Sequence, residues 1–566
     1  MQYTGGRILL ECLKEEGVDT IFGYPGGAIL NIYDDLYKCG DTFRHILTSH
    51  EQGACHAADG YARATGKPGV CFATSGPGST NLITGLATAL LDSSPVVCVT
   101  CSVPSDLRGR DSFQEVDIAN VTAPVTKHTF SVRSVDRLAD TVHEAFAVAC
   151  SGRPGPVLID ISKDVTSRTA DYAPETGPSR RTAGHLRFFT EDYHFEIPAL
   201  KKESVQLLAD MLAAAEKPLI LCGGGVVRSR ADDSFRCFVH KADVPVAVTV
   251  MGTGAIEDRD PLVTGLIGMH GSQASNFAVD QCDLLIAFGC RFSDRVTLTR
   301  SGFASQAKIV QIDIDPFEID KNIRTDHHII GDARQILELL IPMIGQLDHT
   351  EWKAEVFSYP TDTFYDEQPG KLNPGDIFSV IENLAPADAV YATDVGQHQM
   401  WAVQHLPFTY SGQLLTSGGF GTMGFGLGAA IGAKAAFPEK QVIHITGDGS
   451  FRMNCNELAT EAYYELPVIS IVFKNGCLDM VRQWQTMLYG QRYSQTTLDR
   501  PPDFVKLAEA YDLNGFRAAN RTEFEDAFTR ALASDRGTVI ECVIDIDEKV
   551  RPMVNPGGRL SDFLLN

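Results

Sequence analysis

One pattern recurs in three separate blocks of the chain: an apolar run rich in β-branched residues, a Gly-rich turn and then a helical pattern. Such alternation predicts strand–helix units whose strands lie parallel in a sheet that helices cover. A chain of 566 residues has room for three to four domains at about 150 residues each. We therefore expect an α/β fold with three doubly wound parallel-sheet domains, and the first and third blocks are similar in length and order.

Apolar runs and polar stretches set the expected boundaries of these domains. The predicted domains cover residues 1–165, 195–345 and 373–548, followed by a C-terminal arm over 549–566. The polar stretches 166–197 and 348–373 are predicted to be linkers. Strands are predicted at 70–74, 96–101, 157–161, 218–222, 244–250, 284–288, 309–314, 389–393, 442–446, 468–473 and 539–544.

Charge and composition exclude several classes of function. The chain has 49 Lys and Arg against 72 Asp and Glu, a net charge of −23, which argues against binding nucleic acid or an anionic membrane through a basic face. It has no apolar run of about 18 residues and no secretory signal pattern, so we expect a cytoplasmic protein. Cys98 and Cys101 have the spacing of a redox or metal pair, but no second pair accompanies them and a buried strand is expected.

The most informative stretch is Gly447-Asp448-Gly449, which follows a predicted strand. A helical pattern at 456–464 and a further strand lead to Asn475. This strand–helix–strand crossover brings Asp448 and Asn475 to the carboxyl ends of neighbouring parallel strands, where ligands bind in open α/β sheets. Carboxylate and amide oxygens suit Mg²⁺, while glycines and a helix N-terminus suit a diphosphate. The alternative is a strand-end turn and an unrelated Asn turn.

These motifs resemble the signature of the thiamine diphosphate enzymes, in which Gly-Asp-Gly is followed some 25–30 residues later by Asn. The resemblance implies three domains that bind the pyrimidine, a flavin-type nucleotide and the diphosphate. It implies Mg²⁺ ligands at Asp448, Asn475 and the backbone oxygen of Cys477, although Lys474 replaces a usual Asn. The implied thiamine diphosphate contacts are Gly26, Gly27, Gln397, His398, Gly447, Gly449, Ser450 and Met480.

Two further residues take roles from this resemblance. Glu51 follows a short predicted strand, where a glutamate is in general a solvated helix-start residue. In the family this position binds the pyrimidine ring and favours its imino form, which a partly buried carboxyl with a raised pKa would suit. Met423 matches the apolar wedge that bends the cofactor, and the alternative for it is an ordinary core methionine.

Within this family the chain is similar to the acetolactate (acetohydroxyacid) synthase catalytic subunits over nearly its whole length. The stretches that carry the similarity are 22–29, 111–117, 126–128, 268–271, 291–296 and 480–485. The similarity implies decarboxylation of pyruvate on thiamine diphosphate and transfer of the hydroxyethyl carbanion to pyruvate or 2-ketobutyrate. The product is then 2-acetolactate or 2-aceto-2-hydroxybutyrate, in branched-chain amino acid biosynthesis.

The similarity also assigns positions around the substrates. Phe113 and Gln114 match positions near the cofactor, and Lys127 matches one at the substrate entrance. Arg295 matches an arginine that meets the acceptor carboxylate, which a planar guanidinium suits. An ion pair at the surface or between domains is the alternative for Arg295 and Lys127. Trp484 is expected in a loop that lines the acceptor pocket, or else in a core that holds this loop.

The middle block resembles the FAD-binding domain of these synthases, in which the flavin takes no part in net redox chemistry. The matching positions are Arg153, Gly223, Gly224, Met269, His270, Gly271, Arg291, Phe292, Asp313 and Asp332. The family further implies a homodimer or homotetramer and a small regulatory subunit. The stretch 107–110 is more basic than usual, and Asp479 replaces a usual Gly. Arg108 and Arg110 would favour a more anionic acceptor if they faced the substrate.

Two other functions remain open on the sequence. One is a different thiamine diphosphate lyase or transferase, such as a sulfoacetaldehyde acetyltransferase or a pyruvate oxidase. The other is a non-catalytic binding or assembly protein, against which the intact Glu51, Asp448 and Asn475 count.

Overall fold

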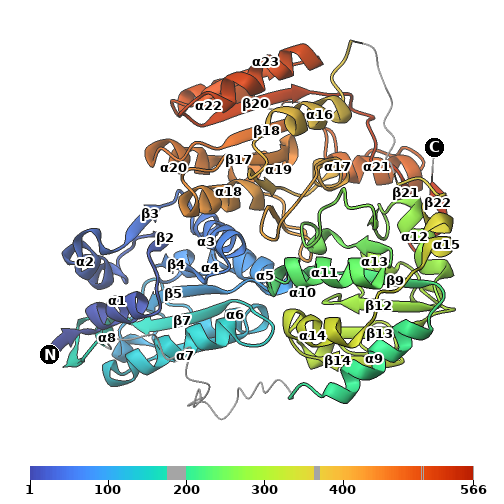
Figure 1. The fold of residues 1–566 in the computed structure, drawn as a ribbon. Helices are drawn as coiled ribbons and strands as arrows, with labels where there is room; N and C mark the ends of the chain where they lie inside the picture. Colours follow the sequence, from blue (N-terminus) through green and yellow to red (C-terminus); the bar gives the residue numbers. More distant parts are fainter. Residues whose placement is uncertain (175–198, 362–369, 499, 501, 565–566) are drawn as a thin grey trace.

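Three six-stranded parallel sheets form the frame of the molecule (Figure 1). The computed structural model describes residues 1–174, 199–361, 370–498, 500 and 502–564. The predicted fold class is confirmed, because each sheet alternates strand and helix along the chain and carries helices on its faces. Cys98 and Cys101 lie in a fully buried strand of the first sheet, as predicted.

The first and third sheets share one strand order. The first runs β3-β2-β4-β5-β7-β6 and the third runs β16-β15-β17-β18-β20-β19. In both, the second strand along the chain lies at one edge and the last two strands are exchanged at the other. The strands of the first sheet are β2 (Thr20–Tyr24), β3 (Arg44–Leu47), β4 (Gly69–Ala73), β5 (Val96–Ser102), β6 (His128–Val132) and β7 (Val157–Ser162). Those of the third are β15 (Val390–Thr393), β16 (Leu414–Thr416), β17 (Val442–Gly447), β18 (Ile469–Lys474), β19 (Asn514–Ala518) and β20 (Thr538–Val543).

The middle sheet has a different order, β11-β10-β9-β12-β13-β14, which is that of a dinucleotide-binding fold. Its strands are β9 (Pro218–Cys222), β10 (Val246–Val248), β11 (Val263–Leu266), β12 (Leu284–Phe288), β13 (Lys308–Asp313) and β14 (His327–Ile330). The predicted strands correspond to strands of the three sheets, and their ends differ by at most two residues.

Helices cover both faces of each sheet. In the first domain these are α1 (Gly5–Glu15), α2 (Leu30–Lys38), α3 (Glu51–Thr65), α4 (Pro77–Thr80), α5 (Ile83–Leu91), α6 (Ile118–Thr122), α7 (Leu138–Cys150) and α8 (Lys163–Ser167). In the middle domain they are α9 (Lys202–Ala214), α10 (Gly224–Arg228), α11 (Asp232–Ala242), α12 (Gln273–Gln281), α13 (Asp294–Thr297), α14 (Ala333–Leu340) and α15 (Thr350–Val356). In the third they are α16 (Pro374–Leu384), α17 (Gln397–His405), α18 (Phe425–Ala436), α19 (Asp448–Asn454), α20 (Leu458–Tyr463), α21 (Asp479–Leu488), α22 (Phe504–Ala510) and α23 (Arg521–Leu532).

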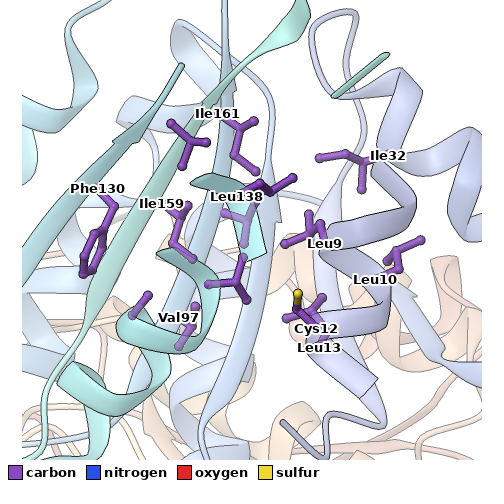
Figure 2. Packing of buried hydrophobic residues seen from close by; sticks show 14 of the residues in the cluster. Leu9, Leu10, Cys12, Leu13, Ile32, Val97, Phe130, Leu138, Ile159 and Ile161 are labelled. Carbon is purple, nitrogen blue, oxygen red and sulfur yellow. The ribbon is translucent and has the colours of Figure 1, made fainter. Parts of the chain in front are cut away.

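Alternation along the strands builds a separate apolar layer on each side of a sheet. On β5, Val97 and Val99 join the cluster under α1, α2 and α7, whereas Val96 and Cys98 face α3 and α5. Figure 2 shows the first of these layers, where Leu9 and Leu13 of α1 lie beside Ile159 and Leu138. A strand buried on both faces reads as a continuous apolar run, which is why β5 was predictable.

The first and third domains meet through a close crossing of α3 and α18, which lie side by side in Figure 1. Glycines allow the backbones to approach. A Cβ atom on Gly60 would lie 2.3 Å from the carbonyl oxygen of Ala429, and one on Gly432 would lie 2.0 Å from that of Ala57. No side chain larger than hydrogen fits at either position without moving a backbone.

A buried charge network joins all three domains beside this crossing. Arg63 of α3 contacts Asp59 at 2.7 Å and Asp92 at 3.2 Å, and its guanidinium donates to the Thr416 carbonyl of the third domain. Arg228 of the middle domain donates to the carbonyl of Asp92. The Asp92 carboxylate also accepts a 2.7 Å bond from the backbone N–H of Gly419. Because these charges are paired and hydrogen-bonded, they fix the domain junction.

Two predicted linkers contain regular structure. In the stretch 166–197, β8 (Thr169–Asp171) pairs antiparallel with β1 (Gln2–Thr4), so this part belongs to the first domain. In the stretch 348–373, α15 buries Trp352, whose indole donates to the Pro218 carbonyl. In these stretches a short apolar face or one aromatic residue is enough for packing, which the polar composition did not predict. The remaining parts of the predicted linkers, 175–197 and 362–369, lie outside the described residues.

The C-terminal arm packs on the middle domain. Its strands β21 (Met553–Val554) and β22 (Phe563–Leu564) pair with each other, and the Val554 N–H donates to the Met269 carbonyl. Asn276 binds the Leu560 carbonyl. Among the described residues, no helix combines the length and the apolar character needed to cross a bilayer.

The glycine crossing gives a test of the domain packing. Gly60→Val should lower the free energy of unfolding by about 1–3 kcal/mol or more, because the new side chain must displace the backbone of Ala429. Gly345→Val is the matched control, since a Cβ atom there meets no described atom within 4 Å. Thermal or denaturant unfolding of both variants checks the prediction, and equal loss of stability in the two would contradict it.

Candidate active site

A first cluster of predicted residues lies at the carboxyl edge of the first sheet. Glu51 begins α3, and His50 caps this helix by accepting from the Gln52 N–H. The Glu51 side chain is buried, and its Oε2 accepts a 2.8 Å hydrogen bond from Asn81 Nδ2. A Cβ on Gly78 would lie 3.0 Å from the other oxygen, so the loop after β4 packs directly on this carboxyl. Glu51 is therefore an enclosed group and not a solvated helix-start residue.

The neighbouring loops carry Gly26, Gln114 and Phe113. A Cβ on Gly26 would collide with Thr74, whereas Gly27 has open space among the described residues. Gln114 has a φ of 60° and lies against Gly76 in the loop after β4. Phe113 beside it is 88% exposed, which is unusual for a large aromatic residue. The structure thus gathers Glu51 and Gln114 around one loop and leaves Phe113 uncovered.

Lys127 is held by backbone carbonyls within a single chain. Its Nζ donates to the carbonyls of Val148 at 2.5 Å and Ser151 at 2.7 Å, inside the first domain. Burial lowers the pKa of Lys127 to about 8. In a single chain the ammonium holds the end of α7, and an entrance position for it remains a prediction.

The basic stretch 107–110 is only partly available to a ligand. The Arg108 guanidinium lies 3.7 Å from the buried carboxylate of Asp160. The Glu115 carboxylate accepts from the backbone N–H groups of Gly109, Arg110 and Ser112. Arg108 therefore stabilises the loop that leads to Phe113, and Arg110 alone of the pair stays exposed.

A second cluster forms at the carboxyl edge of the third sheet. β17 and β18 are adjacent and parallel, so Asp448 and Asn475 do follow neighbouring strands. Asp448 starts α19, which begins earlier than the predicted helix, and its Oδ2 accepts from the Gly476 N–H at 2.9 Å. Asn475 Oδ1 accepts from the N–H of Cys477. Burial and the nearby Asp479 raise the pKa of Asp448 to about 6. A carboxylate that is costly to ionise is one that a bound cation would stabilise.

Polar atoms without partners surround this second cluster. Within the described part of the chain, both ring nitrogens of His398, Oε1 of Gln397 and Nδ2 of Asn475 are buried and have no hydrogen-bond partner. Gly447 lies against the His398 ring, and Ser450 donates to the Val395 carbonyl. Buried polar groups are normally satisfied, so this set fits a polar ligand such as a metal-bound diphosphate.

A cavity of about 900 Å³ extends from this edge into the middle domain. Met423, Met480, Trp484 and Arg295 line one part of it. Met423 joins the cavity to the second cluster, because a Cβ on Gly449 would lie 3.8 Å from its terminal methyl carbon. Trp484 lies on α21 and not in the predicted loop. The guanidinium carbon of Arg295 lies 5.4 Å from the centroid of the Trp484 ring. The Arg295 side chain is 58% exposed and thus open to a ligand.

The middle domain supplies the rest of the cavity wall. The predicted flavin residues that line it are Arg153, Gly224, Met269, His270, Arg291, Phe292, Asp313 and Asp332. Gly223 and Gly271 do not line it, because they pack on backbone: a Cβ on Gly223 would lie 2.3 Å from the Gly289 carbonyl. The structure shows that both glycines allow close strand and turn packing, and their direct contact with a flavin remains a prediction.

Several observations fit a dinucleotide in this part of the cavity. Gly225 and Gly289 are in backbone contact, which leaves the strand ends free of side chains. Nδ1 of His270 is buried without a partner among the described residues. Arg153 is held by Glu318 at 2.8 Å and by Asp315 at 3.4 Å. Burial raises the pKa of Asp313 to about 6. A long polar ligand would satisfy these groups.

Sequence patterns did not predict two contacts within the candidate site. Asn81, which holds Glu51, lies 30 residues away in the chain. Asp479 accepts from the N–H groups of Gln397 and Met480 and lies 3.6 Å from His398 Nδ1. The sequence showed only that Asp479 replaces a usual Gly, and this did not predict its contacts in the second cluster.

Comparison with protein families accounts for this arrangement. Family models described as "Thiamine pyrophosphate enzyme, N-terminal TPP binding domain", "central domain" and "C-terminal TPP binding domain" match residues 3–121, 205–340 and 394–542. The fold and the two clusters thus define a thiamine pyrophosphate enzyme.

Comparison with individual proteins shows to which group of thiamine pyrophosphate enzymes the chain belongs. The chain is 43% identical to the acetolactate synthase isozyme 2 large subunit of Escherichia coli, over 99% of both chains. It is 43% identical to the acetolactate synthase large subunit of Parasynechococcus marenigrum and to the acetolactate synthase of Mycobacterium bovis, over 98% of this chain and 90% of each relative. The chain therefore belongs to the acetolactate synthase large-subunit family of the thiamine pyrophosphate enzymes.

The second cluster predicts how the chain depends on metal. Asp448→Ala should weaken Mg²⁺-dependent binding of thiamine pyrophosphate and leave the fold intact, because it removes the only carboxylate of the expected metal ligands. Asp526→Ala, an exposed carboxylate on α23, is the matched control. Titration followed by tryptophan fluorescence measures both affinities. Equal affinity in the Asp448 variant and the parent chain would refute the assignment.

Proposed function

We propose that this chain is the catalytic subunit of an acetolactate synthase. It decarboxylates pyruvate and joins the remaining two-carbon unit to pyruvate or 2-ketobutyrate, which gives 2-acetolactate or 2-aceto-2-hydroxybutyrate for branched-chain amino acid synthesis. One observation carries the proposal. Arg295 and Trp484 form one wall of the cavity, and Met423 lies between this cavity and the Asp448–Asn475 cluster. Such a wall offers one cation and one flat apolar surface to a small ketoacid.

The second cluster would hold the cofactor. Asp448, Asn475 and the backbone oxygen of Cys477 supply the oxygen ligands that Mg²⁺ prefers. Gln397 and His398 have unsatisfied polar atoms for the diphosphate, beside the strand-end glycines Gly447 and Gly449. When bound, thiamine pyrophosphate supplies the nucleophilic carbon and the electron sink for the reaction.

Glu51 would hold and move a proton at the pyrimidine ring. Asn81 donates to one of its oxygens, and the other lies close to Gly78, where the missing side chain allows this approach. An enclosed carboxyl of which one oxygen accepts no hydrogen bond from the described residues can exchange a proton with a ring nitrogen. Gln114 and Phe113 lie on the adjoining loop and would contact the same substrate region.

Arg295 would orient the acceptor. A guanidinium pairs with a planar carboxylate through two parallel hydrogen bonds, and Asp294 at 3.4 Å is a partner that solvent screens. Trp484 would meet the alkyl end of the same acceptor. Both side chains therefore act on position and not on bond making.

The middle domain would hold FAD. Its strand order is that of dinucleotide-binding sheets, and the predicted residues Arg153, Met269 and Phe292 line the cavity. Carboligation moves no net electrons, so the flavin would remain oxidised during turnover.

A second copy of the chain would complete the site. Glu51 is not among the residues that line the cavity, and Phe113 beside its loop is largely exposed. A homodimer, or a homotetramer built from it, would cover Phe113 and bring a first-domain cluster to a third-domain cluster. A small regulatory subunit, to which the description "large subunit" of two relatives points, and a cytoplasmic location are further parts of this proposal.

Product analysis tests the function. Incubation with pyruvate, Mg²⁺ and thiamine pyrophosphate should yield a product that acid converts to acetoin, without uptake of oxygen. Glu51→Gln should lower this rate by about 10²–10⁴-fold, because an amide cannot share the proton. Glu525→Gln, on the exposed face of α23, is the control. Stoichiometric oxygen uptake with bleaching of the flavin would instead show a pyruvate oxidase.

Trp484 gives a test of acceptor choice. Trp484→Leu should lower the ratio of acetohydroxybutyrate to acetolactate by about 10-fold or more in competition assays, since contact with one methylene is worth roughly 1–3 kcal/mol. The rate with pyruvate alone should largely survive. Tyr489→Leu, 55% exposed at the end of α21, should leave the ratio unchanged. An unchanged ratio in the Trp484 variant would refute a role in acceptor choice.

A further inference from the structure

The first domain contains a second group of chemically reactive side chains, on the sheet face opposite α3. Cys12 and Glu15 lie on α1, and His143 lies on α7, which packs against α1. One ligand atom from each of the three residues lies within 4.8 Å of the others. We propose that Cys12, Glu15 and His143 form a binding site for a divalent transition metal ion, with Zn²⁺ as the best fit.

The donor set matches zinc chemistry. Zn²⁺ binds a thiolate at about 2.3 Å and an imidazole nitrogen at about 2.0–2.1 Å, which places tetrahedral ligands roughly 3.5 Å apart. The three ligand atoms lie within 4.8 Å of one another, so rotation of the side chains has to shorten the longest of these spacings by at most about 1.3 Å. One sulfur, one nitrogen and one oxygen ligand favour Zn²⁺ over Mg²⁺ or Ca²⁺, which prefer oxygen alone.

The surroundings orient the histidine as metal sites do. His143 Nδ1 lies 2.8 Å from a Glu16 carboxylate oxygen, and its Nε2 lies 3.1 Å from Glu15. With Glu15 and Nε2 of His143 as ligands, Nδ1 has the Glu16 carboxylate at hydrogen-bond distance. A carboxylate that accepts the second N–H of a ligating histidine fixes the ring and raises its basicity.

A fourth polar atom, the hydroxyl oxygen of Tyr172, lies next to the three donors. The Tyr172 hydroxyl is 3.4 Å from Cys12 Sγ and donates to Glu15 at 2.9 Å. Tyr172 follows β8, and hydrogen bonds with Met1 hold its backbone. A metal here would join α1, α7 and the chain after β8, three segments far apart in the sequence.

Burial makes the site selective and protected. Cys12 is fully buried within the apolar cluster that Figure 2 shows, and the side chains of Glu15 and His143 are 12% and 19% exposed. With a thiolate and one ligating carboxylate, a divalent cation gives zero net charge at the ligands. The partial exposure of His143 leaves a path for entry.

A metal-free arrangement competes with this one. Burial alone would lower the pKa of His143, but hydrogen bonds to Cys12 and Glu16 raise it to about 10. Without metal, His143 is then an imidazolium between two glutamates, and a bound ion would displace its proton. Only the metal-bound arrangement contains a bond between Cys12 sulfur and a metal ion, and this bond can be observed directly.

Cobalt titration separates them. The full-length chain without an affinity tag is freed of metal, saturated with Mg²⁺ and thiamine pyrophosphate, and titrated with Co²⁺. One thiolate-to-cobalt charge-transfer band per chain is expected, and stoichiometric Zn²⁺ should abolish it. Cys12→Ser and His143→Gln should lose the band, whereas Cys237→Ser, an exposed thiol on α11, should retain it. Glu16→Gln should bind Zn²⁺ about 10–100-fold more weakly.

A second measurement guards against a folding defect. Circular dichroism and acetolactate formation should be the same for the parent chain and for His143→Gln, whose side chain is partly exposed. Zn²⁺ should raise the thermal midpoint of the parent chain and not that of this variant. Absence of the cobalt band in the parent chain, or its survival in folded Cys12→Ser, would overturn the proposal.

Discussion

Backbone contact between α3 and α18 is the constraint on which the rest of the arrangement depends. Gly60 and Gly432 let each helix approach the backbone of the other, so that the two cannot slide or rotate without a clash. α3 begins at Glu51, and α18 begins two residues after Met423. The same crossing therefore sets the positions of Glu51, which we propose moves the proton, and of Met423, which we propose shapes the cofactor. Arg63 extends the constraint to the middle domain, because its partner Asp92 also binds Arg228 and Gly419.

The three sheets place their ligand sites by one topological rule. Where successive connections leave a parallel sheet on opposite faces, a crevice opens at the carboxyl ends of the two strands between them. In the first sheet these strands are β2 and β4, in the middle sheet β9 and β12, and in the third β15 and β17. The loops at these points carry Gly26 and Gly78, Gly225 and Gly289, and Gly396 and Gly447. Each candidate site thus lies at or beside such a point, and glycines there allow close approach of the backbone.

Those features of the fold that depend on local residue patterns could be predicted from the sequence. Buried strands such as β5, the α/β alternation and the neighbouring positions of Asp448 and Asn475 follow from apolar runs and one right-handed crossover. The resemblance to known enzymes added Trp484 and Arg295, and the structure places both at one cavity. Contacts between distant segments were not predictable. Asp479 beside His398, and His143 of α7 between Glu15 and Glu16 of α1, depend on how helices dock. α15 was missed because seven residues with one buried Trp leave almost no periodic signal.

The proposed site has two halves, the Glu51 cluster of the first domain and the Asp448 cluster of the third, and each chain contains one of each. The first and third sheets have the same strand order, and each carries its polar cluster at the carboxyl edge. In one chain, Glu51 binds Asn81 of its own domain, whereas Met423 lines the cavity that reaches the middle domain. A twofold interface between copies would pair each first-domain cluster with a third-domain cluster of the other copy, because such an interface repeats every contact. Two complete sites would form together, and the exposed Phe113 would be covered in both. Loss of the interface would then remove catalysis without disturbing any residue within a single chain.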